Sequence, residues 1–208
     1  KMNIILSSAL LAITYWAFCE GQTDHSRIPA EKLKYMDYTQ NMINGSQELL
    51  LVWGTGRPLH KNQSVCWASS YVGGVKPTFR RNDTFYNKTG DGTGHWETRD
   101  GYWSVGPTNY TPKVQMIDYA SSGKQDPATS GDYTLFFATE HCFVMGLLEG
   151  ENPGNYVTTD APYIPTCLLW AQRGSNHSEE ELCQDAFKSN CSLQNPEYKR
   201  ELCQCDTI

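Results

Sequence analysis

The sequence predicts an all-β domain in which about seven or eight short strands close into a small barrel, with one helix before the strands and one after them. Aromatic residues are abundant, with six Trp, twelve Tyr and seven Phe, whereas only 19% of the residues are charged. Short runs rich in β-branched and aromatic residues are separated by Gly and Pro, which is typical of short strands joined by turns. The run at residues 133–148 is apolar at nearly every position, as expected for a strand with both faces covered in the wall of a closed sheet.

Residues 1–21 have the pattern of a secretory signal peptide. A basic start precedes an apolar run over residues 4–18, and small residues lie near a cleavage point after Cys19 or Gly21. The apolar run is shorter than the roughly 20 residues that a membrane-spanning helix needs. We therefore expect a secreted, extracellular protein in which residues 22–208 form a single domain with a cysteine-rich C-terminal tail.

Composition and motifs argue against several classes of function. The net charge of −6 and the pI of about 5.3 disfavour binding to nucleic acid or to anionic membranes. The sequence contains no Gly-x-Ser-x-Gly, His-Glu-x-x-His or Gly-rich phosphate-loop motif, and its histidines lie in predicted loops or strand ends. We expect a protein that is not an enzyme, needs no cofactor or metal, and is a monomer.

The first predicted element is a helix, for which Pro29 suits the first position and Asn44-Gly45-Ser46 marks the end. Strands are then predicted at residues 48–56, 64–74, 76–86, 94–105, 113–120 and 133–148.

Local patterns within these elements predict further detail. Leu49, Leu51 and Trp53 alternate with their neighbours and should share one face of the first strand. The dipeptide at 100–101 is Asp-Gly, which predicts a hairpin turn. Ser178 and Glu181 form a capping box that should begin the C-terminal helix, ending near residue 189.

The cysteines predict disulfide bonds, because the chain is expected in an oxidising compartment. One of the eight, Cys19, would leave with the signal peptide. An odd number remains, so that at most three bridges form and one thiol is left over. A zinc site is disfavoured, because Cys203-Gln-Cys205 lacks paired Cys-x-x-Cys spacing and has no nearby His. The remaining cysteines are Cys66, Cys142, Cys167, Cys183, Cys191, Cys203 and Cys205.

The density of Asn-x-Ser/Thr sequons predicts a glycoprotein with several occupied sites at its surface. Asn190 is the weakest acceptor because the middle residue of its sequon is Cys191. The expected glycosylation sites are Asn44, Asn62, Asn82, Asn87, Asn109 and Asn176.

Three segments resemble the tick salivary lipocalins, the group that includes the tick histamine-binding proteins: VWGTGRPLHKNQSVCWASSYV, HCFVMGLL and NYVTTDAPYIPTCLLW. The resemblance implies an eight-stranded antiparallel lipocalin barrel with a short N-terminal helix and a C-terminal helix. It also implies one bridge between Cys142 and Cys167 and another from Cys66 to Cys203 or Cys205. The third bridge would use two of Cys183, Cys191 and the remaining tail cysteine, and its pairing stays open.

The resemblance also implies a small ligand inside the barrel. Amine-binding members place an Asp directly after the strand cysteine and a Glu just before the T-T-D segment, because a buried ammonium group needs a carboxylate. Phe143 stands at the Asp position here, and the second position reads Asn155-Tyr156-Val157. These residues favour an apolar lipid over histamine. Three wall aromatics are also expected to contact the ligand: Phe137, Trp53 and Trp103.

Three acidic residues could supply another carboxylate, although each is expected to point outward into solvent: Glu140, Glu97 and Asp118. The expected function is therefore that of a secreted salivary lipocalin that sequesters a small ligand to blunt host defence. The ligand would be a biogenic amine such as histamine or, in better agreement with the sequence, an apolar lipid mediator. The alternative is a modulator of immune cells or complement that binds a host protein through the outside of the same scaffold.

Overall fold

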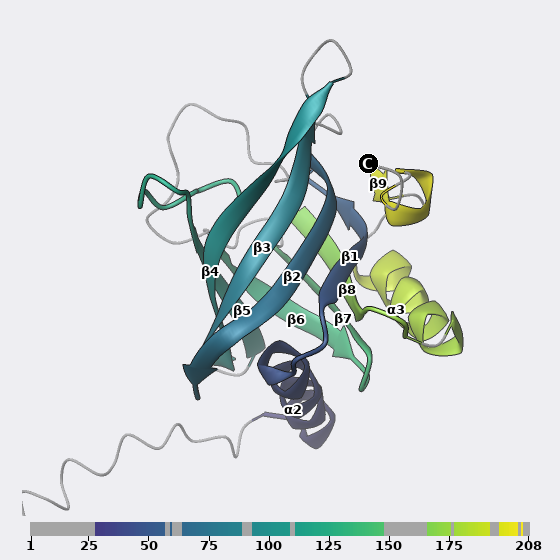
Figure 1. Ribbon diagram of the computed structural model, residues 1–208. Helices are drawn as coiled ribbons and strands as arrows, with labels where there is room; N and C mark the ends of the chain where they lie inside the picture. Colours follow the sequence, from purple (N-terminus) through teal and green to yellow (C-terminus); the bar gives the residue numbers. More distant parts are fainter. Residues whose placement is uncertain are drawn as a thin grey trace, which may run out of the picture.

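Eight antiparallel strands close into a barrel, with one helix across an end and another against the outside (Figure 1). The computed structural model describes residues 28–56, 59, 64–88, 93–108, 111–147, 166–175, 177–191, 196–203 and 205, so the expected signal peptide lies outside them. The elements are α2 (Ala30–Asn44), β1 (Leu49–Thr55), β2 (Ser64–Val75), β3 (Thr78–Lys88), β4 (Gly94–Thr108), β5 (Thr111–Tyr119), β6 (Gly131–Ala138), β7 (Cys142–Leu147), β8 (Thr166–Gln172), α3 (His177–Asn190), β9 (Tyr198–Lys199) and η4 (Arg200–Leu202).

The barrel closes because β1 pairs with strands on both sides. The sheet runs in the order β2-β3-β4-β5-β6-β7-β8-β1, and β1 pairs back to β2 through Leu49 opposite Ser69 and Leu50 opposite Ala68. The two-residue strand β9 adds to β1 near Trp53. The predicted eight-stranded antiparallel barrel with an N-terminal and a C-terminal helix is confirmed. No helix in the described part of the chain is long and apolar enough to cross a membrane.

Two bulges reverse the alternation of side chains and move large aromatics to the outer face. β1 carries an extra residue, Val52, between Leu51 and Trp53 relative to β8. The prediction that Trp53 shares a face with Leu49 and Leu51 is therefore wrong, since Trp53 packs outside the barrel against α3. Phe136 is the extra residue in β6 and also faces outward.

The strand β4 runs without a break through residues 94–108. The hairpin turn predicted at Asp100-Gly101 is wrong, because these residues pair with β3 on one side and β5 on the other. Gly101 has a different purpose, since the place where its side chain would lie is taken by side chains inside the barrel.

Helix α2 covers one end of the barrel and is held there by a buried arginine of β3. Arg81 is fully buried and donates hydrogen bonds to the backbone oxygens of Ile43 (2.6 Å) and Ser69 (2.6 Å) and to the Ser69 hydroxyl (2.8 Å). The carbonyl of Ile43 belongs to the last turn of α2, where carbonyls lack partners within the helix. Arg81 therefore joins this helix end to the barrel wall. Burial lowers the pKa of its guanidinium to about 10.

Helix α3 is fastened to the outer face of β7 and β8 by two disulfide bonds. Cys142 pairs with Cys183, and Cys167 pairs with Cys191. The predicted Cys142–Cys167 bridge is wrong. In the β7–β8 ladder Cys142 lies opposite Ala171, whereas Cys167 lies opposite Gly146, so the two cysteines are four residues apart along the strands. That offset is about 13 Å, roughly twice the Cα separation that a disulfide can span.

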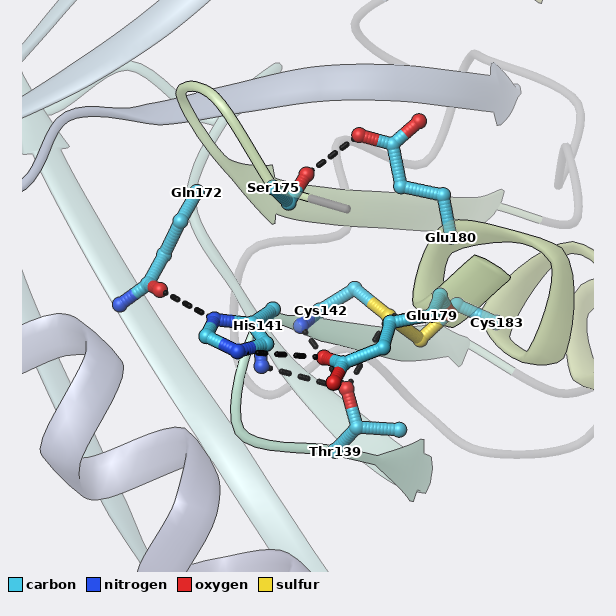
Figure 2. The surroundings of a disulfide bond; sticks show 8 residues. All are labelled: Thr139, His141, Cys142, Gln172, Ser175, Glu179, Glu180 and Cys183. Atoms are coloured by element: carbon cyan, nitrogen blue, oxygen red, sulfur yellow. Dashed lines mark hydrogen bonds and ion pairs between the residues drawn. A yellow bond between two sulfur atoms is a disulfide. The ribbon is translucent and has the colours of Figure 1, made fainter. Parts of the chain in front are cut away.

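Polar contacts around the first of these bonds strengthen the junction (Figure 2). The His141 ring lies between α3 and β8, with Nε2 3.3 Å from a carboxylate oxygen of Glu179 and Nδ1 3.0 Å from the side-chain oxygen of Gln172. The Thr139 hydroxyl accepts hydrogen bonds from the backbone N–H groups of His141 and Cys142, each over 3.2 Å. The start of α3 is therefore tied to the β6–β7 connection covalently and by hydrogen bonds.

The third disulfide attaches the C-terminal tail to β2. It joins Cys66 to Cys205, one of the two tail partners expected for Cys66. Cys203, also included among the disulfide cysteines, is a free thiol, and burial raises its pKa. Cys183 and Cys191 do not pair with each other, since they are eight residues and thus about 12 Å apart along one helix.

Candidate functional site

Two buried aspartates face each other inside the barrel. Asp83 of β3 and Asp118 of β5 are both completely inaccessible to solvent. The prediction that Asp118 points outward is wrong. It follows Val114 and Met116 at every second position of β5, and all three side chains are buried on the inner face.

Gly101 of β4 lies between the two aspartates and leaves room for them. A Cβ atom on Gly101 would lie 2.3 Å from an oxygen of Asp83, 2.9 Å from an oxygen of Asp118 and 3.0 Å from the indole nitrogen of Trp103. All three polar atoms therefore surround one small space. A side chain at position 101 would push the carboxyl groups apart, because real Cβ contacts are not this short.

The two carboxyl groups differ in their hydrogen bonds. The Trp103 indole N–H donates to Asp83 over 2.8 Å. The other oxygen of Asp83 and both oxygens of Asp118 have no donor within the described residues. Burial of an ionised carboxylate without donors costs several kcal/mol. A bound proton or a ligand with donor groups would remove this cost.

Burial and mutual repulsion govern the ionisation of the pair. Burial raises the pKa of Asp118 well above its ordinary value, and the nearby charge of Asp83 raises it further. Burial also raises the pKa of Asp83, but hydrogen bonds from Ser69 and Trp103 and the charge of Arg81 act in the opposite direction. Burial therefore disfavours ionisation of both carboxyl groups, and the opposing contacts of Asp83 make Asp118 the more readily protonated of the two.

Large aromatic side chains also lie inside the barrel, and one of them, Trp103, contacts the acidic pair. Trp103 and Trp170 are fully buried and meet edge to face, with ring centroids 5.2 Å apart. The indole N–H groups of Trp170 and Trp67 have no acceptor within the described residues. Trp67 stacks on Phe85 with ring centroids 4.0 Å apart. The inner face thus combines two carboxyl groups with aromatic rings and unused N–H donors.

A second group of charges lies beside this site. Arg99 contacts Glu97 over 2.8 Å and Asp126 over 2.9 Å, and its guanidinium lies 5.1 Å from the centre of the Phe85 ring. The two groups of charges together contain fewer arginines than acidic residues. The arginines are Arg81 and Arg99, and the acidic residues are Asp83, Asp118, Glu97 and Asp126.

The order and closure of the strands decide the fold type. Each barrel strand pairs with its neighbour in the sequence, β1 returns to β2, and the C-terminal helix lies against the outer wall. The fold is that of a lipocalin. No protein-family model matches the sequence, and no curated protein matches it at a significant level of sequence similarity.

Among solved structures, the chain is similar to Japanin from Rhipicephalus appendiculatus bound to cholesterol, with 18% identity and a TM-score of 0.49 over 72% of this chain and 89% of that one. It is also similar to lobster apocrustacyanin A1, with 12% identity and a TM-score of 0.49 over 86% of this chain and 92% of that one. H1 crustacyanin from the lobster Homarus americanus matches with 11% identity and a TM-score of 0.47 over 86% and 91% of the two chains.

The predicted ligand contacts are distributed over different parts of the barrel. Phe143 and Trp103 are fully buried in the inner cluster. Phe137 is partly buried and meets Tyr35 of α2 edge to face at 5.2 Å. Trp53 lies outside the barrel. The remaining three lie outside the described residues: Asn155, Tyr156 and Val157.

The acidic pair was missed because each aspartate resembles a solvated residue when it is considered alone. Its signal was present in β5, where Asp118 shares a parity with Val114 and Met116.

Among the described residues, no group of three or more His, Cys, Asp or Glu side chains could hold a metal ion.

Proposed function

We propose that this lipocalin is an extracellular carrier that binds a small organic cation inside its barrel, through Asp83 and Asp118. The observation that supports the proposal is the three buried carboxylate oxygens without a donor among the described residues. A protonated amine has up to three N–H donors and one positive charge. It can therefore donate hydrogen bonds to these oxygens and also neutralise a carboxylate. The ligand class is therefore a small primary amine.

The aromatic rings beside the acidic pair suit the same ligand. Trp103 contacts Asp83 and packs edge to face on Trp170, and a cation near the face of an indole gains about 0.5–2 kcal/mol. The free indole N–H of Trp170 can donate to a hydroxyl or ring nitrogen of the ligand. An aromatic amine would use the charged and the aromatic parts of the site together.

Charge balance also favours a cation. Arg81 and Arg99 already have partners, Arg81 mostly among backbone carbonyls and Arg99 between Glu97 and Asp126. The acidic pair is thus left with a shared proton in the empty protein. An ammonium group would replace this proton, so we expect binding to release a proton and to become tighter as the pH rises through the raised pKa of Asp118.

A second candidate is an apolar lipid mediator, the ligand that the sequence favours. Phe143, Met145 and Leu168 provide a continuous apolar surface on the inner faces of β7 and β8. A lipid with a hydroxyl group could contact this surface and donate one hydrogen bond to Asp118. The resemblance of the sequence to tick salivary lipocalins extends either proposal to capture of a host mediator outside the cell, which would blunt host defence.

Isothermal titration calorimetry with serotonin and N-acetylserotonin tests the proposed function. The two compounds share the indole ring, but only serotonin carries an ammonium group. Serotonin should bind at least tenfold more tightly, and Asp118→Asn should remove most of this difference. Asp132→Asn is the matched control, because Asp132 is exposed and accepts a hydrogen bond of 2.8 Å from the Gln115 side chain, away from the acidic pair.

Histamine and cholesterol complete the panel, the first as a smaller cation and the second as a neutral lipid. Equal affinity for serotonin and its acetylated form would contradict the cation proposal. Tight binding of cholesterol with no response to any amine would support the lipid candidate instead.

A further inference from the structure

A groove of about 810 Å³ lies on the outer face of β3, β4 and β5, on the opposite side of the sheet from the acidic pair. Its lining comes from outward-pointing residues of the three strands and from the turn after β5. The volume is within the range of roughly 300–1,000 Å³ that is typical of ligand sites. The central residues are Arg80, Asn82, Asp100, Tyr102, Ile117 and Tyr119.

The charges of this groove neutralise each other. Arg80 and Asp100 are its only charged lining residues among those described, and they form a two-point ion pair with distances of 2.7 and 3.0 Å. The remaining lining is hydroxyl, amide, aromatic and aliphatic. Such a surface suits a neutral, polyhydroxylated occupant better than an ion of either sign.

Aromatic rings provide the surface on which such an occupant would lie. Tyr102 and Tyr119 meet edge to face with ring centroids 5.9 Å apart, and Ile117 lies opposite Tyr102 in the β4–β5 ladder. Tyr102 is 37% exposed although it is a large aromatic residue. Sugars combine C–H faces that stack on aromatic rings with hydroxyls that hydrogen-bond to polar groups such as Arg80 and Asp100.

Asn82 places an attachment point inside the groove. It is exposed on the outer face of β3 opposite Asp100, and it begins the sequon Asn82-Asp83-Thr84. Its side-chain amide makes no hydrogen bond among the described contacts. Asn87 differs, because its amide nitrogen donates to Glu97 over 2.6 Å, and so does Asn190, whose amide nitrogen donates to the Ala186 carbonyl over 2.8 Å.

We propose that Asn82 carries an N-linked glycan whose first sugars lie in this groove against Tyr102 and Tyr119. The glycan would come from a lipid-linked pyrophosphate oligosaccharide. A bond forms between Asn82 Nδ2 and C1 of the first N-acetylglucosamine, the C1–O bond to the pyrophosphate breaks, and the amide proton leaves with the departing pyrophosphate. The inference rests on the extracellular location in the proposed function, but not on the ligand inside the barrel.

The glycan would cover an exposed aromatic face of the sheet. This face has no helix over it in the described structure, whereas α3 covers the opposite wall at β7 and β8. The same acceptor position explains how a sequon in the middle of a strand is compatible with the fold, since the Asn82 side chain points away from the core while Asp83 points into it.

Glycopeptide mass spectrometry of the full chain secreted from insect cells tests the proposal. Asn82 should be occupied in most molecules. Thr84→Ala, which removes the sequon but keeps Asn82, should lose the glycan. Secreted protein that carries glycans at Asn44 but none at Asn82 would overturn the proposal, and so would protein with no glycan at any sequon.

A second measurement tests the contact with the groove. Under native conditions a glycan-releasing amidase should remove the Asn82 glycan at least several-fold more slowly than the glycan at the exposed Asn44. Tyr102→Ala should accelerate release at Asn82 and leave release at Asn44 unchanged. Equal release rates at both positions in the unmodified protein would overturn the placement of the glycan in the groove. Serotonin binding is measured in a separate experiment. A failure of the amine-binding proposal and a failure of the glycan proposal can therefore be told apart.

Discussion

Trp103 donates its indole N–H to Asp83 over 2.8 Å in the centre of the barrel. Together with Ser69 and the charge of Arg81, this bond opposes the rise that burial causes in the pKa of Asp83, whereas burial and the charge of Asp83 both raise the pKa of Asp118. Asp118 is therefore the more readily protonated member of the pair. In the proposed function, an incoming ammonium group would meet one carboxylate held by Trp103 and one carboxyl group that can release a proton.

Asp118→Asn should stabilise the ligand-free protein at neutral pH. The raised pKa of Asp118 means that the fold favours its protonated form, so the stability that it contributes is complete below about pH 4 and is lost as the pH rises through the raised pKa. Asparagine cannot ionise, so the stability of the variant does not fall for this reason as the pH rises. Thermal unfolding should show a melting temperature a few degrees above that of the unmodified protein at about pH 7, with the difference shrinking towards pH 4.

The control for this experiment is Asp132→Asn, which should leave the pH profile of the melting temperature unchanged. A lower melting temperature of Asp118→Asn at neutral pH would mean that the ionised form of Asp118 has donors in the fold.

Gly101→Ala should disturb the site while leaving the strand intact. The new methyl group would lie within 3 Å of both aspartates and would force them apart. We expect amine affinity to fall at least tenfold and the free energy of unfolding to fall by about 1–3 kcal/mol. Gly106→Ala on the same strand is the matched control, because a Cβ there meets nothing within 4 Å. Equal effects of the two substitutions in calorimetry and chemical denaturation would refute this role for Gly101.

Removal of either disulfide of α3 should cost about 3–4 kcal/mol of stability, as expected for loops closed by residues 41 and 24 positions apart. The double substitutions Cys142→Ser with Cys183→Ser, and Cys167→Ser with Cys191→Ser, remove one bond each. Both should lower the denaturation midpoint, and α3 should remain helical while the other bond is present. Peptide mapping without reduction provides the direct check, and recovery of a peptide linking Cys142 to Cys167 would disprove the observed pairing.

Arg81→Lys should loosen α2. Lysine keeps the charge but cannot donate to Ile43 and Ser69 in the fork geometry of a guanidinium. Loss of these charge-assisted bonds should cost about 3 kcal/mol and increase hydrogen exchange in the last turns of α2 more than in β3. Arg80→Lys, at the exposed neighbouring position, should change neither quantity by more than a small amount, and similar exchange in both variants would contradict the role of Arg81.

Local sequence patterns predict both helices and the positions of β1 to β5, but residues 133–148, expected as a single strand, form the two strands β6 and β7. The patterns were also insufficient where a strand contains an extra residue. Val52 and Phe136 are ordinary strand residues, so nothing in their chemistry marks a bulge, yet each reverses the faces that follow it. Trp53 was consequently placed inside the barrel although it packs on α3.

The wrong disulfide pairing and the wrong hairpin turn both depend on the register between neighbouring strands, which local sequence does not reveal. Cys142 and Cys167 are both outer-face residues of adjacent strands, and only the pairing of β7 with β8 shows that they are too far apart to bond. The Asp-Gly pair at 100–101 looks like a turn, because the need for a glycine there arises from side chains of β3 and β5.

The two helices are attached to the barrel by different kinds of bond, and this gives the molecule a mechanical polarity. Two disulfides hold α3 to the wall, whereas among the described contacts α2 is held to the barrel by packing, by Arg81 and by a hydrogen bond from Lys32 to the Phe136 carbonyl. Thermal fluctuations can open non-covalent contacts many times without damage, but they cannot open a disulfide. The barrel can therefore open transiently at the end that α2 covers. The strands β7 and β8, in contrast, move together with α3.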